Sequence, residues 1–183
     1  MRRQPYLNSG LASVYHRGNE MPDSSLRAWT TFIGSHSPVS SPVVLDVGTG
    51  TGMSALALAR WRDARVVAGV DQSPAMLMQA ACHSHHERVA YLAGTATELP
   101  VAEHGFDLVL LSRVIHHIPD LRGTAAELKR ALRRGGVAVV RTTVRDRLDS
   151  RVYDYWPQLR ALDASMFPSQ GQIEGKFVLT FAA

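Results

Sequence analysis

Short apolar runs alternate along the chain with longer stretches whose apolar residues recur at helical spacing. The apolar runs predict five strands, at residues 43–47, 65–70, 89–92, 106–111 and 137–143. The other stretches predict helices at 52–60, 74–86, 124–133 and 149–167, the third stopped by Gly135 and Gly136 and the fourth interrupted near Pro157. The strands are apolar throughout instead of alternating, as in a parallel sheet covered on both faces. We therefore expect an α/β fold with a doubly wound, mostly parallel sheet flanked by helices.

The sequence VVLDVGTGTGMS, residues 43 to 54, places three glycines at alternate positions directly behind the first predicted strand. Glycine accepts a positive φ and lets main-chain atoms approach a ligand where a Cβ would intrude. Ligands of doubly wound sheets bind at the carboxyl ends of the strands, where this loop is expected. Asp71 ends the second strand 19 residues after Gly52, a position from which a carboxylate can accept hydrogen bonds from both ribose hydroxyls.

The spacing of these glycines distinguishes between two kinds of nucleotide ligand. A dinucleotide-binding loop has the pattern G-x-G-x-x-G, whereas here the third glycine comes one residue early and Asp46 precedes the loop by two. A carboxylate repels a pyrophosphate but attracts a sulfonium or an ammonium group. We therefore expect a ligand that carries positive charge at that end.

Composition and charge narrow the class of protein. Of the 183 residues, 45% are hydrophobic and 20% are charged, which fits a single domain with a sizeable core. No stretch approaches the roughly 20 apolar residues of a bilayer-spanning helix, and the start MRRQPYLNSG lacks the apolar segment of a signal peptide. The net charge of +4 comes almost wholly from arginines that are spread along the chain. We expect a cytoplasmic protein with a small-molecule partner, without nucleic acid or membrane.

Five sequence blocks resemble the class I S-adenosylmethionine-dependent methyltransferases, in particular the small-molecule group that includes the ubiquinone and menaquinone C-methyltransferases. The blocks are LDVGTGTG, GVDQSPAML, YLAGTATELP, FDLVLLSRVIHHIPD and ELKRALRRGG with the strand after it, over about residues 10–145. A lone glycine loop is weak support, whereas five blocks in the family's order are specific. The resemblance implies a Rossmann-like fold, S-adenosylmethionine as methyl donor, S-adenosylhomocysteine as product, and no metal.

The resemblance also implies a cofactor role for residues at the strand ends. Asp46 and the loop of Gly48, Thr49, Gly50 and Gly52 would hold the methionine end, Asp71 the ribose, Gln72 and Met76 the adenosine, Thr95 and Ala96 the adenine, and Ser112 with Arg113 the floor beneath the sulfonium. At Thr95 the family commonly has an aspartate, so we expect a weaker bond to the adenine amino group. Arg17 and Asn19 are both candidates for the role of the family's N-terminal arginine.

Candidates for the acceptor side come from histidines and aromatic residues. His117 is the candidate catalytic residue, because a neutral imidazole can accept a proton as methyl transfer proceeds; a bond to the following turn is the alternative. Tyr15, His116 and Tyr155 are candidates for substrate contacts, with packing as the alternative. The cluster CHSHH at 82–86 has zinc-ligand residue types, but such close spacing at a helix end predicts no metal site.

We expect one methyltransferase domain over residues 1–183, with an N-terminal helical lid at 1–40, a cofactor-binding core at 41–145 and a shortened C-terminal region at 146–183. The family completes its sheet with an antiparallel hairpin, whereas only residues 176–181 (KFVLTF) predict a further strand here. The predicted hairpin is therefore truncated, and the exposed sheet edge makes a homodimer possible. Two other functions stay open: binding of S-adenosylmethionine without catalysis, and methylation of RNA.

Overall fold

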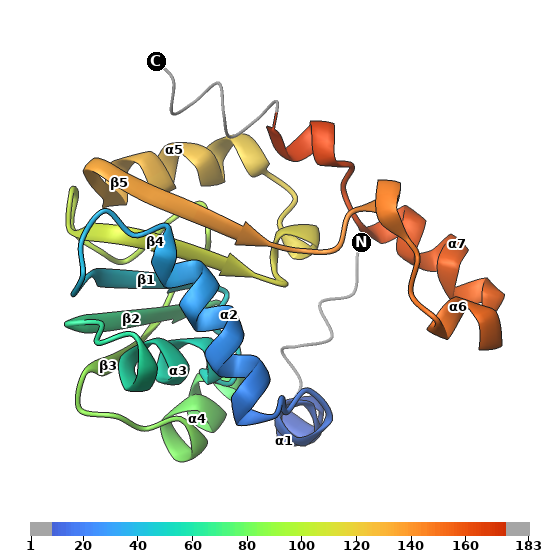
Figure 1. The fold of residues 1–183 in the computed structure, drawn as a ribbon, viewed down its shortest axis with the longest axis horizontal. Helices are drawn as coiled ribbons and strands as arrows, with labels where there is room; N and C mark the ends of the chain where they lie inside the picture. The colour runs from blue at the N-terminus through green and yellow to red at the C-terminus, as the bar shows by residue number, and fades with distance from the viewer. Residues whose placement is uncertain (1–8, 175–183) are drawn as a thin grey trace.

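The computed structural model describes residues 9–174, which form a central five-stranded sheet with helices on both faces and further helices beyond the carboxyl end of β5 (Figure 1). The strands are β1 (Val43–Val47), β2 (Val66–Asp71), β3 (Val89–Ala93), β4 (Phe106–Ser112) and β5 (Leu132–Arg141). The helices are α1 (Ser9–Gly18), α2 (Asp23–Ser35), α3 (Met53–Trp61), α4 (Pro74–His83), α5 (Leu121–Ala131), α6 (Val152–Tyr155) and α7 (Pro157–Met166), with 3-10 turns η2 (Ile115–His117) and η3 (Arg145–Arg147). All strands are parallel, in the spatial order β3-β2-β1-β4-β5, which confirms the predicted doubly wound fold.

The central strands are apolar throughout because both faces of the sheet are covered. Successive residues of a strand point to opposite faces, so Leu45 of β1 packs with Leu128 of α5, whereas Val44 packs with Leu58 of α3. Burial of each such side chain contributes about 1.5–3 kcal/mol relative to its exposure to water. The absence of polar alternation in the sequence therefore follows from a sheet that has core on both sides.

Polar residues fix the start of two helices that border the carboxyl end of the sheet. Ser73 precedes α4, where its hydroxyl accepts a hydrogen bond from the backbone N–H of Met76. Asp120 precedes α5, where its carboxylate accepts hydrogen bonds from the backbone N–H groups of Arg122 and Gly123. These caps satisfy donors that a helix leaves unpaired in its first turn, so the loops before them have defined positions.

Two predicted helix ends were wrong. The helix predicted to run to residue 133 ends at Ala131, and one strand runs from Leu132 through both glycines to Arg141. Leu132 has an extended conformation and its side chain is buried in the core. The glycines that follow lie where the β4–β5 pairing is irregular, and Gly135 has a φ of 79°. The helix predicted to reach residue 86 ends at His83, since the buried Ser84 hydroxyl donates a hydrogen bond to the carbonyl of Thr51.

The C-terminal helices lie beyond the carboxyl end of β5 (Figure 1). The predicted break near Pro157 is confirmed, because α6 ends at Tyr155 and α7 begins at Pro157. Within residues 9–174 no strand follows β5, and the strand predicted at 176–181 lies outside the described residues. No helix in this part of the chain combines the length and the apolarity that a crossing of the membrane needs.

Candidate functional site

The glycine loop lies at the point where the strand order of the sheet reverses. The chain passes from β1 outward through β2 to β3, and then returns to place β4 on the other side of β1. The loop after β1 therefore opens into the crevice between two halves of the sheet, where doubly wound proteins bind their ligands. Gly48, Gly50 and Gly52 have φ values of 71°, 56° and 79°, as the sequence pattern predicted.

Two of the loop glycines have different steric surroundings. A Cβ at Gly48 would lie 2.2 Å from a methyl carbon of Val114, so this position is closed by packing. A Cβ at Gly50 would meet no atom within 4 Å, so the main chain at this position faces open space. Gly50 is therefore the residue at which a ligand can approach the backbone directly.

A cavity of about 360 Å³ lies over the carboxyl ends of the strands. Most of the predicted cofactor residues line it, namely Gly48, Thr49, Gly50, Asp71, Gln72, Met76, Thr95, Ala96, Ser112 and Arg113. Tyr15 and His117 line it as well. The predicted residues that do not line it are Asp46, Gly52, His116 and Tyr155.

Asp71 connects the end of β2 to the glycine loop. One carboxylate oxygen accepts a hydrogen bond from the backbone N–H of Gly50 at 2.8 Å, and the other accepts one from the N–H of Ser73 at 2.9 Å. Burial raises the pKa of Asp71, while these hydrogen bonds and the nearby imidazole of His117 oppose that rise. The carboxylate thus lies at the cavity wall, and beyond these two bonds its oxygens have lone pairs that can accept from further donors.

Asp46 lies beneath the loop and not at the cavity wall. Its side chain is buried and accepts a hydrogen bond at 2.7 Å from the hydroxyl of Thr49, which does line the cavity. Burial raises the pKa of Asp46 to about 6, and the hydrogen bond from Thr49 opposes this rise. The position gives no support to the predicted direct contact between Asp46 and the ligand, because Thr49 stands between them.

The side of the cavity beside β2 and β3 is formed by uncharged residues. Met76 is buried and lines the cavity, whereas Met78, two residues along α4, is exposed. Of these two methionines it is therefore Met76 that borders the site. The hydroxyl of Thr95 lies 3.3 Å from the hydroxyl of Thr97, so the position that is an aspartate in the family has a neutral side chain with a neutral partner.

The opposite side of the cavity is formed by the ends of β4 and β5. Arg113 follows β4 with a positive φ of 58°, which is uncommon for a residue with a side chain, and its guanidinium donates to the Asn19 side-chain oxygen at 2.8 Å. Asn19 lines the cavity and Arg17 does not, so of these two N-terminal candidates it is Asn19 that reaches the site. The backbone N–H of Arg113 donates to the carbonyl of Arg141 at 2.7 Å, which ties the two strand ends together.

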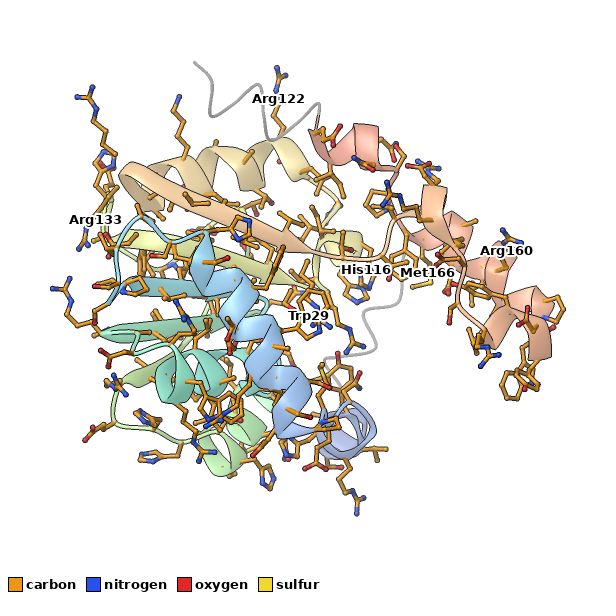
Figure 2. The ribbon with its side chains drawn as sticks, viewed as in Figure 1. Trp29, His116, Arg122, Arg133, Arg160 and Met166 are labelled. Atoms are coloured by element: carbon orange, nitrogen blue, oxygen red, sulfur yellow. The ribbon has the colours of Figure 1, made fainter. Side chains whose placement is uncertain are left out.

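Among the lining residues that were not identified from the sequence, Arg141 and Trp29 lie against each other. Arg141 ends β5 and donates to the hydroxyl of Ser112 at 3.2 Å, and its guanidinium lies over the ring of Trp29, 4.1 Å from the ring centroid. Trp29 is a residue of α2 and lies beside the carboxyl ends of the strands (Figure 2). The position of Arg141 near the end of a predicted strand was the one sequence feature that could have indicated a site residue there. No sequence feature indicated that Trp29 lies at the site.

The two adjacent histidines have different surroundings. His117 lines the cavity, and burial lowers its pKa, while Asp71 opposes the shift. His116 lies between the sheet and the C-terminal helices (Figure 2), with its ring 3.9 Å from that of His117 and 4.7 Å from that of Phe167. Burial lowers the pKa of His116 to about 4. His117 therefore keeps its place as a candidate catalytic residue, whereas His116 does not reach the cavity.

The structure gives no support to the predicted substrate contact of Tyr155. Tyr155 belongs to α6, and 76% of its surface is exposed to solvent outside the cavity. The sequence suggested this contact because Tyr155 follows the last predicted strand, but α6 does not contribute a residue to the cavity wall. Tyr15 of α1, the other tyrosine candidate, does line the cavity.

The described residues contain no cluster of three or more His, Cys, Asp or Glu side chains arranged to hold a metal ion. Cys82, in the sequence cluster CHSHH, is a free and exposed thiol.

A parallel sheet whose strand order reverses at a glycine loop, with a carboxylate at the next strand end, is typical of the α/β proteins that bind nucleotide-like cofactors. Within that class, residues 45–140 match a family described as "Methyltransferase domain". The chain belongs to this family, the class I S-adenosylmethionine-dependent methyltransferases.

Curated relatives and solved structures agree with this family. A demethylmenaquinone methyltransferase of Roseiflexus castenholzii is 28% identical over 150 residues, which cover 81% of this chain and 63% of that protein. A malonyl-[acyl-carrier protein] O-methyltransferase of Xylella fastidiosa is 39% identical over 97 residues, 52% of this chain and 32% of that protein. A solved structure described as an S-adenosylmethionine-dependent methyltransferase of Methanococcus maripaludis has the same fold, with a TM-score of 0.78 at 17% identity, over 100% of this chain and 86% of that one. The chain thus spans less than two thirds of the length of these two curated relatives.

Proposed function

We propose that the protein transfers the sulfonium methyl group of S-adenosylmethionine to a small-molecule acceptor. The observation that carries this proposal is the cavity at the reversal point, where Gly50 presents open backbone beside the carboxylate of Asp71. The likeness to curated enzymes that methylate a quinone precursor and a carrier-bound malonyl group supports a small acceptor. A cytoplasmic location belongs to the same proposal.

The residues at the cavity wall fit such a cofactor. Asp71 would accept hydrogen bonds from the ribose hydroxyls, and Met76 with Thr95 would border the adenine. The backbone of Gly50 would approach the methionine end, with Thr49 held in place by Asp46. When bound, S-adenosylmethionine supplies an electrophilic methyl group on a positively charged sulfur.

The protein contributes to the reaction mainly by holding the acceptor in line with the methyl group. Such positioning lowers the activation free energy by on the order of several kcal/mol. Helix α1 supplies Tyr15 to the wall, α2 supplies Trp29, and the turn between these helices supplies Asn19, which supports the proposal that residues 1–40 form a lid. Because burial lowers the pKa of His117, its imidazole is neutral at pH 7 and can accept a proton from a hydroxyl or amine.

Calorimetry with the full chain tests the cofactor assignment. We expect binding of S-adenosylmethionine and S-adenosylhomocysteine, and none of NAD, because Asp46 and the early third glycine do not suit a pyrophosphate. Tight NAD binding without a response to the other two ligands would refute the assignment. Binding of both sulfur compounds without methyl transfer to any acceptor in a broad small-molecule panel would instead favour the binding protein without catalysis.

A further inference from the structure

The two ends of the cavity carry opposite charge. Asp71 ends β2 and Arg141 ends β5, and three strand spacings of about 4.8 Å each separate these strand ends by about 14 Å. Arg113, at the end of β4, also lines the cavity on the side of Arg141. Asp120, the other lining carboxylate, accepts hydrogen bonds from the first turn of α5. The acidic end is the one proposed to hold the cofactor, and the basic end is left for the acceptor.

Neither guanidinium at the basic end has a carboxylate partner within the described part of the chain. Among residues 9–174 the ion pairs are Arg88–Asp63, Arg130–Glu127 and Arg133–Asp107, all of them away from the cavity. Arg113 donates to the amide oxygen of Asn19, and Arg141 to the hydroxyl of Ser112. Both acceptors are neutral, so the positive charge at this end of the cavity is not balanced by the described protein groups.

The surroundings of Arg141 disfavour its positive charge and hold its guanidinium in one orientation. Its side chain is partly buried, and both burial and the neighbouring charge of Arg113 lower its pKa. The central carbon of the guanidinium lies over the ring of Trp29, and one of its N–H groups donates to the hydroxyl of Ser112, so contacts on two sides hold the guanidinium while its other N–H groups are left as donors. A planar, partly desolvated guanidinium held in this way suits an oxygen anion bound in its plane.

We propose that the acceptor is an apolar molecule carrying an anionic oxygen group, a carboxylate or a phenolate, which Arg141 binds with the help of Arg113. This inference rests on the proposed function, because it assigns the acceptor to the end of the cavity that the cofactor leaves free. Leu26, Ile33 and Trp29 line the same cavity and suit an apolar body. Arg141 is then a specificity-determining residue, and Trp29 positions it.

Matched aromatic probes test this assignment by binding alone. Naphthoate, naphthamide and naphthylmethylamine have the same apolar body and carry an anionic, a neutral and a cationic group. Each is titrated by calorimetry into the full chain, first alone and then with saturating S-adenosylhomocysteine. We expect naphthoate to bind at least about tenfold more tightly than naphthamide, and the amine to bind most weakly, as charge-assisted hydrogen bonds to a guanidinium predict.

Variants separate the role of the guanidinium from that of charge and of shape. Arg141→Gln is expected to weaken naphthoate about tenfold or more and to leave naphthamide and S-adenosylhomocysteine within about twofold. Arg141→Lys keeps the charge without the planar fork, so its affinity for naphthoate is expected to lie between those of the original chain and of Arg141→Gln. The matched control is Arg122→Gln, which removes the same charge from an arginine that points away from the sheet (Figure 2) and is expected to bind all probes as the original chain does. Thermal melting of each variant reports whether the fold is kept.

Several results would overturn the proposal. Equal binding of naphthoate and naphthamide, preference for the amine, or no binding of any probe would each show that the basic end does not select an anion. An equal loss of both probes in Arg141→Gln would show that Arg141 only shapes the cavity. Failure of the proposed function has a different result, since S-adenosylhomocysteine would then not bind while the preference for naphthoate over naphthamide in the protein alone persisted.

Discussion

Replacement of Asp46 by asparagine should change the pH dependence of stability in a defined direction. Asp46 is 1% exposed and accepts a hydrogen bond from Thr49 at 2.7 Å. Asparagine has nearly the same shape and can accept that bond with its side-chain oxygen, but it carries no charge at any pH. The comparison therefore isolates the free energy of keeping a carboxylate ionised beneath the glycine loop.

The size of the effect follows from the pKa of Asp46, which burial raises from 3.8 to about 6. Because the folded protein holds this proton more tightly than the unfolded chain, the contribution to stability is full below about pH 4 and is lost as pH rises to about 6. The shift of about two units at 1.36 kcal/mol each amounts to about 3 kcal/mol of unfolding free energy. The asparagine variant should not lose this free energy. The unfolding free energy of the variant minus that of the original chain should therefore rise by about 3 kcal/mol across that range.

Urea unfolding followed by tryptophan fluorescence, at intervals from about pH 4 to about pH 7, measures this difference. Asp154→Asn is the matched control, because it makes the same replacement on the exposed face of α6. A difference between the Asp46 variant and the original chain that stays constant over this range would refute the reasoning. So would a variant that becomes relatively less stable as pH rises, since Asp46 would then be stabilised as an anion.

Three further changes test the site and the end of the chain. Asp71→Ala removes the proposed acceptor of the ribose hydroxyls and should cost about 1–3 kcal/mol of S-adenosylhomocysteine binding by calorimetry; since it also leaves the N–H groups of Gly50 and Ser73 without this acceptor, melting checks that the fold is retained, and unchanged affinity would place the ribose elsewhere. Gly50→Ala and Gly135→Ala both put a Cβ at positive φ with no protein atom within 4 Å, so each should lose about 1–2 kcal/mol of stability, but only Gly50→Ala should weaken cofactor binding. Deletion of 170–183 removes Ile173 from its contact with the core and should lower the melting temperature or change the elution volume, and identical behaviour would show that this segment adds nothing.

The cofactor side of the cavity could be predicted further than the acceptor side. Gly50 and Asp71 follow strands whose apolar runs are plain in the sequence, so their meeting at one edge of the sheet follows from the order of the strands along the chain. Arg141 and Trp29 are 112 residues apart, and no local pattern indicates that the guanidinium lies over the ring. Their contact depends on how α2 packs over the sheet, which is a property of the whole fold.

The sequence by itself determined the parallel type of the sheet, because strands covered on both faces must be apolar throughout, and it determined the loop of Gly48 to Gly52, because glycine suits the positive φ values there. The tertiary structure decided which charged groups reach the cavity. Asp46 and Tyr155 both looked available from their positions in the chain, yet one is covered by Thr49 and the other faces solvent on α6. The backbone conformation of a strand or a glycine loop depends mainly on nearby residues, so it can be predicted from the sequence. Access to a cavity depends on packing between segments that are distant in the chain.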